Sequence, residues 1–182
     1  MALPEEKKYT IDDIYKLPEG IRAELIDGQI YYMAPPSTTH QRISGKIYRQ
    51  IADFFDLNNG VCEVFAAPFA VFLSEDDTKY VEPDISVICD PDKLDDRGCH
   101  GAPDWIIEIV SPSNSSHDYI NKLALYKAAG VREYWIIDPK RNAILVYFFE
   151  EKSFNVIHHT LQDKVTVNIY DDLAIDFSHF GI

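Results

Sequence analysis

The sequence predicts an α/β fold, a mixed α/β domain in which helices pack against a central sheet. Two apolar runs, residues 85–88 and 105–110, have the length and the β-branched composition of buried strands. Two longer stretches, residues 38–55 and 116–129, carry apolar residues at helical spacing. With 182 residues, 46% of them hydrophobic, the chain is expected to form a single domain over residues 1–182.

Capping and turn residues define the elements of the first half. Thr10 and Asp13 resemble a capping box, which opens a short helix. Asp27-Gly28 suits a type I′ turn and predicts a hairpin, while Gly60 ends the longer helix. The elements expected here are a helix over 10–17, strands over 22–26 and 29–33, a helix over 38–55, and strands over 61–66 and 69–73.

The second half is divided in the same way, since Gly130 ends a helix and Asp138-Pro139 forms a turn. The elements expected here are strands over 84–89 and 104–110, a helix over 116–129, strands over 133–137, 143–149 and 154–160, and an apolar turn near 177. The predicted order is α-β-β-α-β-β-β-β-α-β-β-β, with the helices against one sheet.

The composition of the chain limits which partners and which cellular location are expected. A polar N-terminus and the lack of a membrane-length apolar run predict a cytoplasmic protein with no membrane contact. Cys62, Cys89 and Cys99 are an odd set without C-x-x-C spacing, so neither a disulfide framework nor a zinc site is expected. The 30 acidic and 17 basic residues give a net charge of −13, which argues against tight binding to DNA.

A carboxylate interrupts the second apolar run. Alternation along a strand puts Glu108 on the same face as Ile106 and Val110. Both faces of this strand are then apolar, which is typical of a central strand covered on both sides. A buried carboxylate is costly unless it is paired, protonated or bound to a cation, so we expect a functional site here. An edge strand with one exposed face would also tolerate the residue.

Asp84 follows Pro83 and opens the first apolar run, where on its own it would be an ordinary strand-start residue. If the two strands are neighbours, Asp84 at the start of one meets Glu108 near the end of the other. Two carboxylates at adjoining strand ends supply the hard oxygen ligands of Mg²⁺ and leave positions for water and phosphate. The pair therefore predicts a Mg²⁺ site.

Lys122 lies in the predicted helix 116–129, one turn after Asp118 and one turn before Tyr126. Two interpretations are equally supported by this spacing. Lys122 is either an exposed ion pair with Asp118, worth about 0.3–0.5 kcal/mol, or a functional amine that reaches across the edge of the sheet.

Two further residues give weaker signals. Glu24 lies on a predicted hairpin strand, where a carboxylate is more often solvated than a ligand. His40 lies one turn before Ile43 on the predicted helix, where a packed or partly exposed histidine is more common than a catalytic one. No G-x-S-x-G, P-loop, dinucleotide-binding or H-E-x-x-H motif offers a competing chemistry.

These residues occur in the order of a known family pattern. The segments that match are Glu24-Leu25-Ile26-Asp27-Gly28, His40, Pro83-Asp84, Glu108-Ile109-Val110-Ser111-Pro112-Ser113, Asp118, Lys122, Tyr126 and Gly130-Val131-Arg132-Glu133-Tyr134-Trp135. Together they resemble the Uma-two family of restriction endonucleases, a branch of the PD-(D/E)XK nuclease superfamily. The likeness extends from about Tyr9 to Val146.

The resemblance implies a restriction-endonuclease-like core, with a central mixed sheet flanked by helices, an N-terminal hairpin and C-terminal strands. It implies that Asp84 and Glu108 bind the metal, with Glu24 as a further acidic member of the metal site. The superfamily lysine two residues after the glutamate is replaced by Val110, and Lys122 looks like its migrated replacement.

The expected function is therefore Mg²⁺-dependent hydrolysis of phosphodiester bonds in DNA, with Mn²⁺ as a substitute metal. Asp84, Glu108, Lys122 and Glu24 are the expected catalytic residues, and His40, Tyr126 and Asp118 are secondary candidates. Binding to DNA is expected to be weak and salt-dependent, and a homodimer is expected because one active site cuts one strand. The alternative is a non-catalytic dimeric module that binds nucleic acid or another partner and retains the nuclease fold.

Overall fold

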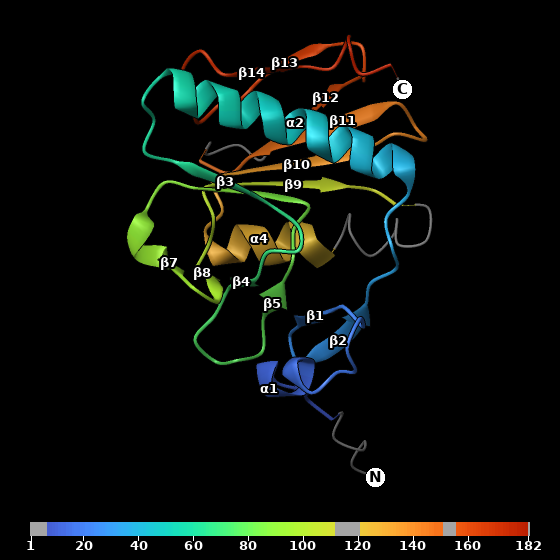
Figure 1. The fold of residues 1–182 in the computed structure, drawn as a ribbon, viewed down its shortest axis with the longest axis vertical. Coiled ribbons are helices and arrows are strands. Elements are labelled where there is room, and N and C mark those ends of the chain that lie inside the picture. Colours follow the sequence, from blue (N-terminus) through green and yellow to red (C-terminus); the bar gives the residue numbers. More distant parts are fainter. Residues whose placement is uncertain (1–6, 112–120, 151–155, 182) are drawn as a thin grey trace.

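The computed structural model describes residues 7–111, 121–150 and 156–181 and contains two six-stranded sheets (Figure 1). The main sheet contains, in spatial order, β12 (Val156–His159), β11 (Ala143–Phe148), β10 (Glu133–Asp138), β9 (Trp105–Ile109), β6 (Ile85–Ile88) and β3 (Glu63–Ala66). It is a mixed sheet, because β9 and β10 are parallel while the other neighbouring pairs are antiparallel.

The second sheet is formed by the hairpin and by several very short strands. Its order is β2 (Gln29–Tyr32), β1 (Ala23–Ile26), β5 (Tyr80–Val81), β4 (Val71–Phe72), β8 (Gly98–His100) and β7 (Leu94–Asp95). The remaining described elements are α1 (Ile11–Tyr15), α2 (Thr38–Leu57), the 3-10 helix η1 (Pro91–Lys93), α4 (Leu123–Ala129) and the pair β13 (Lys164–Thr166) and β14 (Ala174–Asp176).

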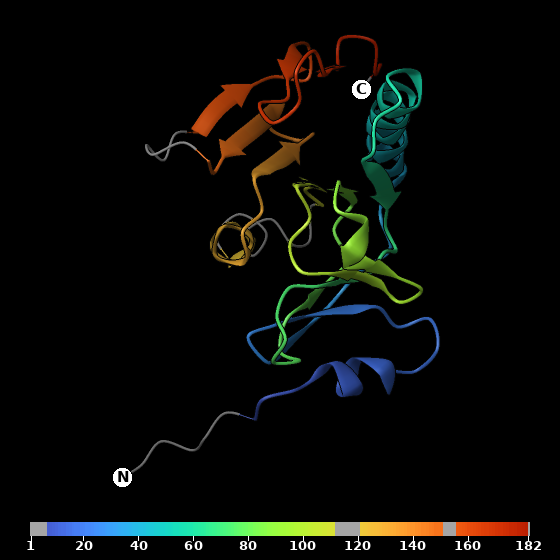
Figure 2. The same ribbon diagram turned by 90° about the vertical axis from the view of Figure 1, so that its left-hand side faces the viewer.

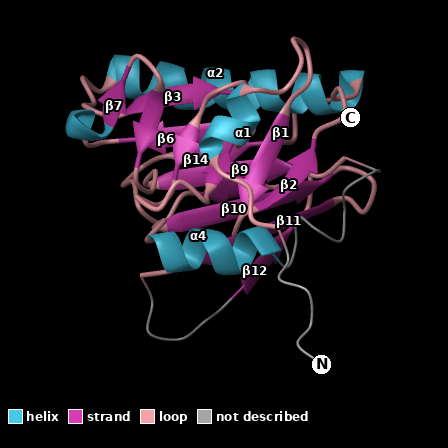
Figure 3. Cartoon of the chain, turned by 90° about the horizontal axis from the view of Figure 1, so that it is seen from below, coloured by secondary structure: helices cyan, strands magenta, loops and turns pink. Residues whose placement is uncertain are grey.

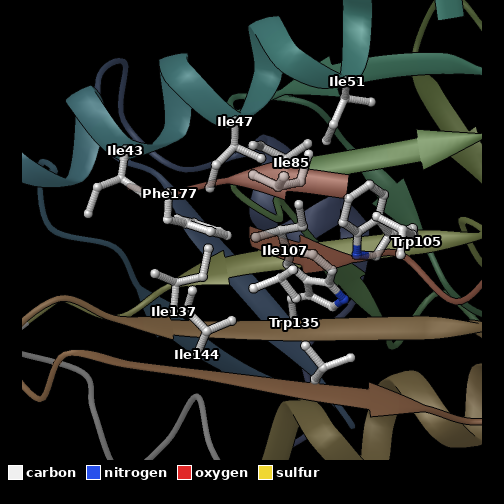
Figure 4. Packing of buried hydrophobic residues seen from close by; sticks show 14 of the residues in the cluster. Ile43, Ile47, Ile51, Ile85, Trp105, Ile107, Trp135, Ile137, Ile144 and Phe177 are labelled. Atoms are coloured by element: carbon white, nitrogen blue, oxygen red, sulfur yellow. The ribbon is translucent and has the colours of Figure 1, made fainter. Parts of the chain in front are cut away.

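The helices α2 and α4 lie on opposite sides of the main sheet (Figures 1 and 3). Ser37 caps α2 by accepting a hydrogen bond from the backbone of His40 at 3.2 Å, so the helix begins at Thr38, the first residue of the predicted range. Ile43, Ile47 and Ile51 then point into the core at helical spacing and are fully buried (Figure 4).

The predicted central strand is confirmed. β9 lies between β10 and β6, and its alternate residues enter two different cores. Trp105 and Ile107 pack with α2, whereas Ile106 and Val110 pack in the core that contains α4. The second core also contains residues of the second sheet, which lies below the main sheet in Figure 2. Glu108 therefore faces the layer between the two sheets.

The hairpin turn is also confirmed, because Asp27 and Gly28 both have the positive φ angles, 51° and 81°, that a type I′ turn requires. The prediction of one sheet is wrong. Strands of two or three residues, such as β4, β5 and β8, are too short to produce an alternating pattern that a sequence would reveal.

The prediction that no disulfide is present is wrong for one pair, since Cys62 and Cys89 are bonded and Cys99 is free and buried. β3 pairs with β6 in a register that sets Glu63 opposite Ile88, so the residues that flank this pair are also opposite each other. The spacing of the cysteines along the sequence does not reveal that register. The predicted helix over 116–129 is described only from residue 121, and its first residues lie outside the described part of the chain.

In the part of the chain that the structure describes, no helix has both the length and the apolar composition needed to cross a membrane.

A buried carboxylate attaches the C-terminal segment to the main sheet. Glu133 on β10 is fully buried and accepts hydrogen bonds from the indole nitrogen of Trp135 at 2.6 Å, from the backbone and side-chain amides of Asn168, and from the backbone of Ile169. Burial raises the pKa of Glu133, and these four hydrogen bonds to the ionised form oppose the rise.

We expect Glu133→Gln to lower the free energy of unfolding by about 1–3 kcal/mol. The side-chain NH2 group of glutamine would face N–H groups that now donate to the carboxylate, and these donors would lose their acceptor. Urea denaturation would measure the change, with the exposed Glu63→Gln as the matched control. Equal midpoints for the two variants would show that Glu133 does not hold the C-terminal segment.

Candidate active site

The two sheets, α2 and the residue that precedes α4 enclose a small cleft of about 80 Å³. It collects five of the residues singled out from the sequence: Glu24, His40, Asp84, Glu108 and Lys122. Tyr126 lies directly behind it, bonded to Glu108. Asp118, the remaining candidate, lies outside the described residues.

The register of the main sheet brings the two principal acids together. β6 and β9 are antiparallel neighbours with Ile85 opposite Ile107, so Asp84 falls opposite Glu108. Directly opposed residues share a face of the sheet, with Cβ atoms about 4.5–5.5 Å apart. Both carboxylates therefore point toward the layer between the sheets, as the sequence predicted if these strands were neighbours.

Asp84 is fixed by two contacts to its Oδ2 atom. The backbone N–H of Ile109 donates to it at 2.7 Å, and Nε2 of His40 lies 3.0 Å away. His40 is itself buried on the first turn of α2, which Ser37 caps. The start of the core helix thereby sets the position of Asp84.

Lys122 joins the acids of the two sheets. Its Nζ donates to Oε1 of Glu24 on β1 at 2.9 Å and to Oε1 of Glu108 on β9 at 2.7 Å. Lys122 is only 4% exposed, and Glu24 and Glu108 are similarly buried. The interpretation of Lys122 as an exposed surface pair is therefore wrong, as is the view of Glu24 as a solvated hairpin residue.

Tyr126 supports the same carboxylate from one turn further along α4. Its hydroxyl donates to Oε1 of Glu108 at 2.7 Å. Complete burial, together with the charges of Glu108 and Glu24, raises the pKa of Tyr126 well above its ordinary value. The hydroxyl consequently stays protonated and serves as a hydrogen-bond donor, which fixes the orientation of Glu108.

A second layer of polar residues was not identified from the sequence. The backbone of Glu82 donates to Oε1 of Glu24 at 3.2 Å, and the side chain of Glu82 accepts from Arg22 and Tyr80. Arg22 carried a usable signal, because it shares a strand face with Glu24. Glu82 carried none, since it follows a strand of two residues.

The oxygen-rich walls of the cleft fit a hard cation that keeps part of its water shell. Within residues 7–111, 121–150 and 156–181, no three His, Cys, Asp or Glu side chains form a group that would hold a metal by themselves. Mg²⁺ does not require such a cage, since proteins commonly bind it through one or two carboxylates plus substrate phosphates. Asp84 and Glu108 are the pair of carboxylates that could hold such an ion.

The pattern of the Uma2 family, described as "Putative restriction endonuclease", matches residues 11–178. The chain belongs to the Uma2 family. The resemblance seen in the sequence is thus confirmed, and it covers nearly the whole chain. An uncharacterised protein of Synechocystis sp., slr1290, is 31% identical over 162 residues, which span 87% of this chain and 84% of that protein.

A solved structure gives the same result for the fold of this Uma2 protein. The crystal structure described as "a putative nuclease belonging to DUF820" from Anabaena variabilis matches it with a TM-score of 0.76 and 23% identity. The match covers 94% of this chain and 96% of the other. The predicted fold class, a mixed α/β core with a central mixed sheet, is therefore confirmed.

The buried ion triad of Lys122, Glu24 and Glu108 leads to a stability prediction. We expect Lys122→Met to lower the free energy of unfolding by about 3–5 kcal/mol, because two buried carboxylates lose their shared cation. The double variant Lys122→Met/Glu24→Gln should recover part of this loss, since it removes one of the uncompensated charges.

Chemical denaturation in chelator measures these differences, and the exposed Lys140→Met provides the same charge change away from the cleft. The control is expected to stay within about 0.5 kcal/mol of wild type. A Lys122→Met protein as stable as the control would contradict the triad.

Proposed function

We propose that this Uma2 protein is a Mg²⁺-dependent endonuclease that hydrolyses phosphodiester bonds in DNA, with Mn²⁺ as a substitute metal. The observation that carries the proposal is the opposition of Asp84 and Glu108 on adjacent strands, with Lys122 bonded to Glu108. The family description supports a nuclease, which is a hydrolase.

Asp84 and Glu108 are the proposed metal ligands. Bound Mg²⁺ would polarise the scissile phosphate and acidify the attacking water. On the protein side, Ile109 fixes Oδ2 of Asp84, while Tyr126 and Lys122 fix Oε1 of Glu108. The carboxylates are thereby held in one orientation before any ligand arrives, which reduces the entropy cost of binding.

Lys122 and Glu24 act together in this proposal. Glu24 and Glu108 hold the ammonium group of Lys122 at the wall of the cleft, where it would orient the water and stabilise negative charge on the phosphate in the transition state. Glu24 keeps Lys122 in place and remains the third acid beside the metal position. His40 positions Asp84 through the contact of its Nε2 with Oδ2.

DNA is the proposed substrate. A homodimer is the proposed assembly, because one such site cuts one strand and a duplex has two. The net charge of −13 means that affinity for DNA should be weak and should fall steeply with added salt.

Cleavage of plasmid and single-stranded DNA in Mg²⁺, in Mn²⁺ and in chelator tests the proposal. We expect activity only with metal, and we expect Asp84→Asn and Glu108→Gln to reduce the rate to less than about one hundredth of wild type. The amide introduced by Asp84→Asn retains an oxygen that can accept from Ile109, so the loss should reflect charge rather than misfolding.

The exposed substitutions Asp53→Asn and Glu63→Gln are matched controls and should cleave normally. Cleavage that persists in chelator, or in both cleft variants, would refute the metal mechanism. A wild-type protein that binds DNA without cutting it would support the non-catalytic module instead.

A further inference from the structure

Arg22 places a cationic group on the cleft that contains the proposed active site. It lies just before β1, where hairpin pairing continues through a hydrogen bond from Met33 N to its carbonyl oxygen at 2.9 Å. Its side chain lines the cleft and is 34% exposed, in contrast to Lys122. The guanidinium is thus accessible from the same space as the acids.

The position of this guanidinium is fixed from behind by Glu82. Nε and Nη2 of Arg22 both donate to Oε2 of Glu82, at 2.8 and 2.5 Å, while the hydroxyl of Tyr80 donates to Oε1 at 2.6 Å. Glu82 is buried, so the ion pair is shielded from solvent on that side. Among the described residues, Glu82 is the only group bonded to the guanidinium of Arg22.

Charge in the cleft distinguishes the two cations. Lys122 lies between two carboxylates, which together outweigh its charge. Arg22 uses two of its five N–H donors on Glu82, and the remaining donors form part of the planar group that matches phosphate oxygens in pairs. An anion that enters the cleft would therefore find at Arg22 a positive charge with hydrogen-bond donors still available.

The separation from the acids indicates which phosphate would bind. Arg22 and Glu24 are two residues apart on one extended segment, or about 7 Å along the chain. The guanidinium is bonded to Glu82 and not to Glu24, Asp84 or Glu108, so it lies beside these acids and suits a neighbouring phosphate of the strand rather than the one that is cut.

We propose that Arg22, held by Glu82 and Tyr80, forms a subsite for a backbone phosphate adjacent to the scissile phosphate of a DNA strand. This inference rests on the proposed nuclease function for the identity of the ligand. In it, Glu82 is a positioning residue that fixes the guanidinium before the strand binds, so that little side-chain entropy is lost on binding. A simpler view makes Arg22 only the counter-ion of buried Glu82.

The double variant Arg22→Gln/Glu82→Gln separates these views, because it removes both charges and leaves the net charge of the protein unchanged. Fluorescence anisotropy with a short labelled DNA strand and its duplex, in Ca²⁺ and in chelator over a salt series, gives Kd and its salt dependence. Arg97→Gln is the control, since Arg97 is exposed and lines a different cleft, and Glu82→Gln removes the positioning residue while keeping the charge of Arg22.

We expect the double variant to bind about tenfold more weakly or worse, the scale of one lost charge-assisted contact. The slope of log K against log salt should become shallower by about 0.7–0.9. Arg97→Gln should bind as wild type does, and Glu82→Gln should keep the wild-type slope. Wild-type Kd and slope in the double variant, or no binding by wild type at low salt, would overturn the proposal.

Arg22→Lys provides an independent variant if the double variant does not fold. Lysine retains a charge that can pair with Glu82 but lacks the planar guanidinium group. The melting temperature should therefore stay at the wild-type value, while Kd should rise severalfold. Wild-type affinity in Arg22→Lys would also overturn the subsite. Failure of the wild type to cleave DNA would refute the nuclease function alone, because the binding series still decides the role of Arg22.

Discussion

The arrangement of the whole site depends on one buried ammonium group. Lys122 is bonded to Glu24 in the second sheet and to Glu108 in the main sheet, while its own backbone leads into α4. Removing three charged groups from water is expensive, and their attraction repays that cost only when the geometry is good and further hydrogen bonds complete the set. Tyr126 and the backbone of Glu82 supply those bonds.

The surrounding fold keeps this arrangement rigid. β9 is buried on both faces, α2 covers one side of the main sheet, and the second sheet covers part of the other (Figure 1). Because close-packed interiors transmit strain, the isoleucine stripe of α2 also constrains His40 at the beginning of that helix. Packing and site geometry are therefore set by the same elements.

The sequence was sufficient for the features that local chemistry determines. Alternation around Glu108 predicted a central strand, and the Asp27-Gly28 turn predicted the hairpin. The pairing of strands was not accessible in this way, because Cys62–Cys89 and the second sheet depend on contacts between distant segments. For Lys122 the spacing allowed two interpretations equally, and only tertiary structure shows that the residue is buried between Glu24 and Glu108.

The order of these residues along the chain has a consequence for biosynthesis. Glu24, Asp84 and Glu108 leave the ribosome before Lys122, and β10, the neighbour of β9 in the main sheet, follows later still. A nascent chain that ends before Lys122 contains the acids without the cation that joins them. The cleft can therefore take its final form only after most of the polypeptide has been made, and a chain that stops before Lys122 would lack the ion triad altogether.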